Sequence, residues 1–111
     1  MATLHIEHKI TGFGEWKTAF DRFAEYRVQA GVRSHTIRRP IDDTNYVLID
    51  LDFDSPEAAG SFLQVLKERV WASRQNAPAL VGSPQTRILE TEESSPPEAD
   101  QLGSGQVASV T

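Results

Sequence analysis

The alternation of hydrophobic and polar positions predicts a strand near the start of the chain. In residues 3–10 the hydrophobic side chains occupy every second position, which is the period of a strand with one buried face. One face carries Leu4, Ile6, His8 and Ile10, and the other carries Thr3, His5, Glu7 and Lys9. His5 and His8 therefore point to opposite sides and do not bind one metal ion together, so we expect no metal site.

From Glu15 to Ala30 the hydrophobic period changes to that of a helix. Trp16, Phe20 and Phe23 share one side of this helix, opposite the charged residues. Gly31 follows directly, where a left-handed cap that ends a helix belongs.

Arg27 falls on the hydrophobic side of the same helix, and Tyr26 flanks it. The arginine either extends its charged end to solvent or meets a carboxylate, enolate or phenolate in a pocket, a role suited to its forked donors. The tyrosine either packs as an amphipathic side chain or donates a proton.

Two strand-like runs, 32–39 and 45–53, flank a segment in which Pro40, Asp42 and Asp43 favour a turn. They predict an antiparallel hairpin. If the five turn residues 40–44 are unpaired, His35 lies beside Ile49, on the side that carries the core residues of the second run.

A second helix is predicted from Ser55, which is a plausible N-cap followed by Pro56 in the first turn. Its hydrophobic side consists of Ala59, Phe62, Leu63, Leu66 and Val70. In a regular helix Trp71 projects away from that side, so it either marks the helix end or packs on another surface. After a connection at 72–84, residues 86–91 form a last strand.

The predicted order is β-α-β-β-α-β. With right-handed crossovers it gives an α+β, ferredoxin-like fold, in which a four-stranded antiparallel sheet carries two helices on one face. The other face would expose Tyr46 and Leu48 as an apolar area. A second copy of the chain could cover it, so we expect a homodimer.

Charge divides the chain into a domain at 1–91 and an acidic, disordered tail at 92–111. The 111 residues carry a formal charge of -5, but residues 1–91 hold 12 acidic and 11 basic side chains, so the domain has a charge of 11 - 12 = -1. The basic residues are scattered, and nucleic acid is therefore not an expected partner.

Cysteine is absent from the sequence, which fits a reducing compartment. The first residues lack the pattern of a secretory signal, and no apolar run reaches the roughly 20 residues that a membrane span needs. We therefore expect a soluble cytoplasmic protein without a membrane partner.

Three features resemble a known superfamily: the element order, the run from Val47 to Phe53 that leads into Asp54-Ser55-Pro56-Glu57-Ala58-Ala59 and Phe62, and the closing strand Thr86 to Glu90. Over residues 2–91 the chain resembles the dimeric α/β-barrel superfamily, which includes antibiotic-biosynthesis monooxygenases, small polyketide cyclases and stress-responsive barrel proteins. The resemblance implies a ligand pocket between sheet and helices in each subunit, and a barrel closed by two subunits.

Candidate catalytic residues are His35, Arg27 and Tyr26. His35 would act as a general base, because histidine titrates near neutral pH, and Arg27 or Tyr26 would stabilise the resulting oxyanion. Candidate ligand-binding residues are His8, Trp16 and Trp71, the tryptophans by stacking on a planar ligand. Each of the six also has a structural reading as a core, rim or anchoring side chain.

Cofactors are not implied by any motif. Gly12-Phe13-Gly14 lacks the third glycine of a dinucleotide loop, and no phosphate-loop or nucleophile-elbow pattern occurs. Haem-degrading members of the superfamily use an axial histidine downstream of a tryptophan, but this sequence has no histidine after His35.

Two functions follow from these observations. The first is a cofactor-independent monooxygenase or cyclase that acts on a small aromatic or polyketide-like substrate. The second is a non-catalytic dimeric module that binds a small ligand or serves assembly alone. A haem or metal protein is the least favoured reading.

Overall fold

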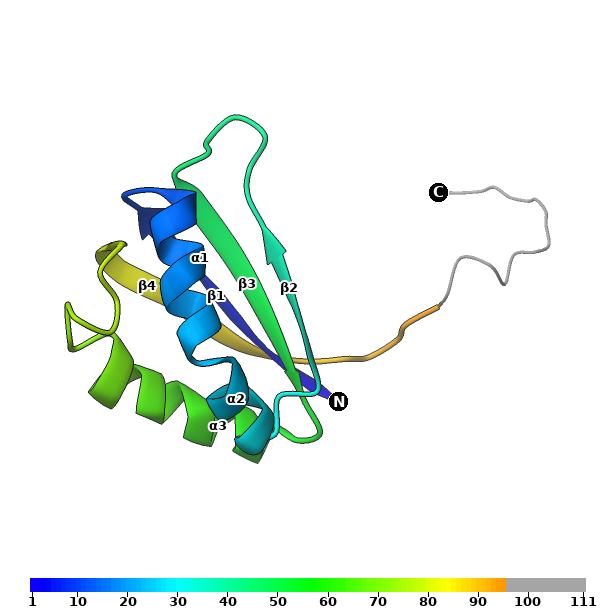
Figure 1. The fold of residues 1–111 in the computed structure, drawn as a ribbon. Coiled ribbons are helices and arrows are strands. Elements are labelled where there is room, and N and C mark those ends of the chain that lie inside the picture. Colours follow the sequence, from blue (N-terminus) through cyan, green and yellow to red (C-terminus); the bar gives the residue numbers. More distant parts are fainter. Residues whose placement is uncertain (96–111) are drawn as a thin grey trace, which may run out of the picture.

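The computed structural model describes residues 1–95. In chain order the elements are β1 (Ala2–Ile10), α1 (Phe13–Arg22), α2 (Ala24–Gln29), β2 (Ser34–Arg38), β3 (Tyr46–Phe53), α3 (Pro56–Val65), a π-helical turn (Leu66–Val70) and β4 (Leu80–Glu90). The strands form one sheet in the order β2-β3-β1-β4, and every neighbouring pair is antiparallel. The helices lie on one side of it (Figure 1). The predicted α+β, ferredoxin-like fold is confirmed.

The core lies between the inner face of the sheet and the helices. Along β1 and β3 every second residue is buried, as the alternation predicts. The most completely buried large side chains are Phe53, Leu4, Leu51 and Val47. Each contributes about 1.5–3 kcal/mol by leaving water, so the two central strands dominate the stability.

The first helix is not continuous as predicted. It breaks at Phe23, whose φ of -101° and ψ of 16° are not helical. The break leaves the last carbonyls of α1 without their usual donors, and Arg27 Nη1 donates to the Phe20 carbonyl at 2.6 Å. The predicted left-handed cap is confirmed, because Gly31 has a φ of 99°.

The second helix begins as predicted. Ser55 is the N-cap, and its hydroxyl accepts a hydrogen bond from the backbone N–H of Ala58 at 3.2 Å. The helix then ends in the π-helical turn, which the hydrophobic pattern of the sequence does not predict. In this turn the backbone N–H of Trp71 donates to the carbonyl of Leu66 at 2.7 Å, five residues earlier.

The hairpin pairs two residues away from the predicted register. His35 lies opposite Leu51 rather than beside Ile49, and Ile37 lies opposite Ile49. The loop is longer than the five turn residues, since β2 ends at Arg38 and β3 begins at Tyr46. A shift of two residues keeps every side chain on its own face, so His35 still faces the helix side.

The last strand begins at Leu80, six residues before its predicted start at 86. Its pairing with β1 shifts between Glu7 and Lys9, so that β4 bulges opposite His8. Gly82 lies in this bulge with a φ of 75°, a conformation that glycine adopts without strain. Because the bulge interrupts the alternation of hydrophobic and polar residues, the sequence pattern does not predict the first half of β4.

The helix-free face of the sheet is mixed, with a polar centre on β1 and β3 and the exposed side chains of Val81 and Leu89 on β4. The Tyr46 hydroxyl donates to Glu7 Oε1 at 2.7 Å, and Leu48 is only half-buried beside it. His5 contacts both Glu7 and Asp50, at 2.9 and 2.6 Å. Ion pairs and hydrogen bonds therefore cover the centre of this face.

The predicted tail at 92–111 falls mostly outside the described residues. Residues 92–95 are exposed and form no helix or strand, and 96–111 are not described. No helix in the described part of the chain is long and apolar enough to cross a membrane.

Candidate functional site

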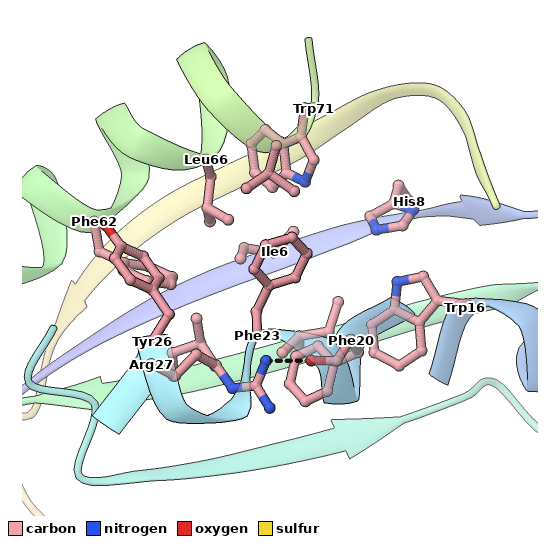
Figure 2. A pocket seen from close by; sticks show the side chains of 13 residues that line it. Ile6, His8, Trp16, Phe20, Phe23, Tyr26, Arg27, Phe62, Leu66 and Trp71 are labelled. Carbon is pink, nitrogen blue, oxygen red and sulfur yellow. Dashed lines mark hydrogen bonds between the residues drawn. The ribbon is translucent and has the colours of Figure 1, made fainter. Parts of the chain in front are cut away.

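A cavity of about 80 Å³ opens between the sheet, α1, α2 and the end of α3. It has room for more than one water molecule, and its walls are mainly aromatic and aliphatic (Figure 2). The lining residues are Ile6, His8, Trp16, Phe20, Phe23, Tyr26, Arg27, Ile49, Leu51, Phe62, Leu66, Val70 and Trp71. Five of the six sequence-predicted site residues are among them, and His35 is not.

His8 supplies the nitrogen base of the cavity. It lies on the inner face of β1, opposite the β4 bulge, and only 5% of it is exposed. Its Nδ1 lies 2.9 Å from the Lys9 carbonyl, and because a carbonyl only accepts, Nδ1 carries the proton in the neutral ring. Burial lowers the pKa of His8, while the Lys9 carbonyl acts in the opposite sense.

The neutral tautomer of His8 leaves its Nε2 as an acceptor. Among residues 1–95 the structure gives this nitrogen no hydrogen-bond partner. Figure 2 shows the ring at the end of the cavity next to Trp16 and Trp71. A neutral imidazole with an unused lone pair, at an apolar cavity, has the state that a general base requires.

Trp71 reaches the cavity because of the π-helical turn. A π turn holds one residue more than an α turn, so it rotates the following residues by about 100°. The hydrophobic positions of a regular helix would end at Val70, whereas here both Val70 and Trp71 line the cavity. Trp71 is half-buried, so its ring packs on the core and also faces the open space.

Trp16 and Phe20 form the opposite wall. Trp16 is buried, and its ring stacks on Phe20 with 4.9 Å between centroids. The guanidinium of Arg27 also lies over the Phe20 ring, 3.5 Å from the ring centroid. Trp16 is thus both a helix anchor and a flat wall for a planar ligand.

Arg27 is a buried cation, with 6% of it exposed. It neither extends to solvent nor pairs with a carboxylate in the described part of the chain; its hydrogen bond goes to the Phe20 carbonyl (Figure 2). Burial lowers the pKa of Arg27, partly offset by the charge of Asp21. The residue keeps positive charge beside an apolar cavity, where an anion would be stabilised.

Tyr26 stands at the end of the cavity away from His8, as Figure 2 shows. Its ring stacks on Phe62 with 5.9 Å between centroids, and 40% of the residue is exposed. The hydroxyl group therefore lies in reach of solvent at the mouth, and the two polar ends of the cavity are well separated.

His35 lies outside the cavity. It is exposed on the edge strand β2, and its ring meets Phe20 edge-on at 5.3 Å. Partial burial lowers the pKa of His35, and the charges of Arg27 and Lys17 lower it further against the opposing effect of Asp21. Phe20 stands between it and the cavity, so the structure does not bring His35 together with the other five residues.

Phe23 and Phe62 are site residues that the sequence pattern does not single out. Both lie on hydrophobic helix sides, where the pattern assigns them to the core. Both line the cavity, and Phe23 is itself the residue at the helix break. Within residues 1–95, no three His, Asp or Glu side chains are grouped so that they could hold a metal ion.

Comparisons with known proteins find relatives in structure only. No protein-family model matches the chain, and no curated protein matches its sequence. SnoaB, a cofactor-independent oxygenase from Streptomyces nogalater, superposes with a TM-score of 0.64 at 17% identity, covering 86% of this chain and 96% of that one.

Two further solved structures share the fold. The ActVA-Orf6 monooxygenase of Streptomyces coelicolor, in complex with nanaomycin D, gives a TM-score of 0.61 at 15% identity and covers 86% of this chain and 91% of that one. A dimeric ferredoxin-like protein from an uncultured marine organism gives a TM-score of 0.55 at 10% identity and covers 85% of this chain and 97% of that one. Identities this low show a common fold and not a common activity.

Proposed function

We propose that the protein is a cofactor-independent oxygenase of a small hydroxylated aromatic compound. The observation that carries this proposal is His8, a buried neutral imidazole with a free Nε2 on an apolar, aromatic-walled cavity. The fold shared with SnoaB and with the ActVA-Orf6 monooxygenase supports the same class of reaction.

In the proposed reaction His8 Nε2 takes the proton of a phenolic hydroxyl group. The electron-rich ring then forms a carbon–oxygen bond with O₂ at the para carbon, and the imidazolium returns the proton to give a hydroperoxide. His8 next removes the hydrogen of that carbon, the O–O bond breaks, and hydroxide leaves as water with the proton from the imidazolium. For 1-naphthol the products are 1,4-naphthoquinone and water.

Arg27 and Tyr26 keep the roles expected of them in this proposal. The buried charge of Arg27 lowers the energy of the phenolate, and it does so through space because its recorded hydrogen bond goes to Phe20. Tyr26 contacts the far end of the ligand at the mouth. His35, exposed beyond Phe20, is the weaker candidate for the base.

A non-catalytic ligand-binding or assembly module is the second candidate. It is favoured by the hydrogen bonds that His8 and Arg27 already make to backbone carbonyls, since these give both residues a structural use. We further propose that the protein is a homodimer, as the ferredoxin-like protein of the same fold is described to be.

Oxygen consumption with 1-naphthol as the substrate, in buffer without added cofactor or metal, tests the function. We expect His8→Gln to lower kcat by about 100-fold or more, the usual contribution of a general base, and to leave 1-naphthol bound. His35→Gln is the matched control and should retain turnover. If His8→Gln retains turnover, His8 is not the general base. If the wild type binds 1-naphthol without turnover, the ligand-binding module is favoured.

A further inference from the structure

Phe23 stands at the junction of three hollows. Besides the cavity of about 80 Å³, a second of about 60 Å³ extends toward Ala79 and Leu80, and a third of about 320 Å³ opens beside Arg69. Of the residues that line them, Phe23 alone is common to all three. Figure 2 shows its ring in the middle of the cavity, between α3 and the helix break that carries it.

The backbone of Phe23 is the break itself. It is at once the C-terminal cap of α1 and the residue before α2, and its φ and ψ lie outside the helical region. The carbonyl of Phe20 accepts hydrogen bonds from Arg27 Nη1 at 2.6 Å and from the backbone N–H of Phe23 at 3.2 Å, rather than from a helical N–H four residues on. Phe23 is therefore joined to two short rigid helices at a point where small changes of φ and ψ move its ring.

We propose that the three hollows are subsites of one ligand channel, and that Phe23 is the gate that sets how long a ligand the channel accepts. The inference deepens the proposed oxygenase function and rests on it. With the ring in place, the inner cavities suit a ligand of one or two fused rings. With the ring displaced, they join the mouth at Arg69 and Asn76, and a linear ligand of three or four rings fits along aromatic walls.

The polar groups along the channel fit a ligand with oxygen substituents at both ends. His8 lies at the inner junction of the first two hollows. Arg69 and Asn76 line the mouth, and the Asn76 side chain is oriented by donating to the Arg69 carbonyl at 2.8 Å. A polycyclic hydroxyquinone has this distribution of apolar rings and terminal oxygens.

Binding of two probes tests the gate: 1-naphthol, with two rings, and 6-hydroxytetracene-5,12-dione, with four. Quenching of the tryptophan fluorescence reports both, because Trp16 and Trp71 line the inner cavities. We expect Phe23→Ala to lower the Kd of the four-ring probe about tenfold relative to that of 1-naphthol, the scale on which pocket shape discriminates between ligands. Phe23→Trp should shift the ratio the opposite way.

Phe13→Ala is the matched control. Phe13 lies on the same side of α1 and packs against the core, but it lines none of the three hollows, so its loss should leave the ratio of the two Kd values unchanged. Phe23→Leu replaces Phe23→Ala if urea unfolding shows that the alanine variant does not fold. An unchanged ratio in the folded variant overturns the gate.

Failure of the proposed function would look different, because the wild type would then consume no oxygen with 1-naphthol, whether or not the two probes bind. In that case crystals of the Phe23 variant under xenon pressure decide the gate alone. Xenon sites that run continuously from Leu80 to Arg69 support it, and hollows that stay separate overturn it.

Discussion

His8 and His5 lie on the same strand, three positions apart, and the sheet gives them opposite surroundings. His8 faces the helices and meets one carbonyl, whereas His5 faces away and lies between two carboxylates. The alternation of β1 predicts the two faces correctly. It does not predict which histidine has a cavity beside it, since that depends on how distant helices pack on the sheet.

Protonation of His8 should destabilise the fold. Burial lowers its pKa in the folded protein below the ordinary value of 6.5, so as the pH falls the unfolded chain takes up the proton first. The stabilisation is complete above the unfolded pKa and is lost as the pH falls toward the folded one. Urea unfolding between about pH 7.5 and pH 5 should show wild type losing stability relative to His8→Gln; a constant difference would contradict a buried neutral His8.

His5 should behave in the opposite way. Burial alone would lower its pKa, but the hydrogen bonds and charges of Glu7 and Asp50 outweigh this and raise it above 6.5. Its stabilisation is therefore full below the unfolded pKa and is lost as the pH rises through the folded pKa. The advantage of wild type over His5→Gln, measured by the same unfolding experiment, should shrink as the solution becomes more alkaline. An advantage that grows with pH would mean that His5 is neutral in the network.

At the scale of elements, the strands and the starts of helices can be predicted from neighbouring residues, whereas the irregular segments that interrupt helices and strands cannot. The alternation of the strands, the turn at Pro40 and the Ser55 cap each depend on a few neighbouring residues. The break at Phe23, the π-helical turn and the bulge at Gly82 each depend on what the segment packs against. Residues of the first two of these segments, Phe23 and Val70, line the cavity, which is why the sequence predicts the fold more completely than the site.

The π-helical turn is open to a direct test. Because it holds one surplus residue, deleting the exposed Lys67 should restore a regular helix and keep Trp71 directed at the cavity. Restored hydrogen bonds should raise the free energy of unfolding by about 1 kcal/mol. In a Trp16→Phe background the emission of Trp71 should stay blue-shifted, as for a ring that remains packed.

Insertion of one alanine after Lys67 is the counterpart of that deletion. It should rotate Trp71 by about a further 100°, away from the cavity, and shift its emission to the red. If the deletion gives the red shift and the insertion does not, the turn is not what directs Trp71 inward.

At the scale of the whole molecule, the uncovered face of the sheet needs an explanation. Helices cover one side, and the other holds His5, Glu7, Asp50 and Tyr46 in a network of paired charges and hydrogen bonds, with Leu48 among them. A face that carries both acidic and basic groups can be complementary to a copy of itself turned by two-fold symmetry. We therefore still expect the dimer contact on this face of the sheet, but with charged and polar contacts as well as apolar ones.

Light scattering at micromolar concentration should give twice the mass of one chain, and the dimer should weaken as salt is added, because screening acts on its paired charges. Leu48→Glu places a further acid beside Glu7, which Leu48 directly faces across the β1–β3 pair, and should yield a monomer. Val28→Glu adds the same charge on α2, where Val28 is 72% exposed away from this face, and should remain dimeric. A wild-type monomer would contradict the dimer, and a dimeric Leu48→Glu that unfolds normally in urea would place the interface on another surface.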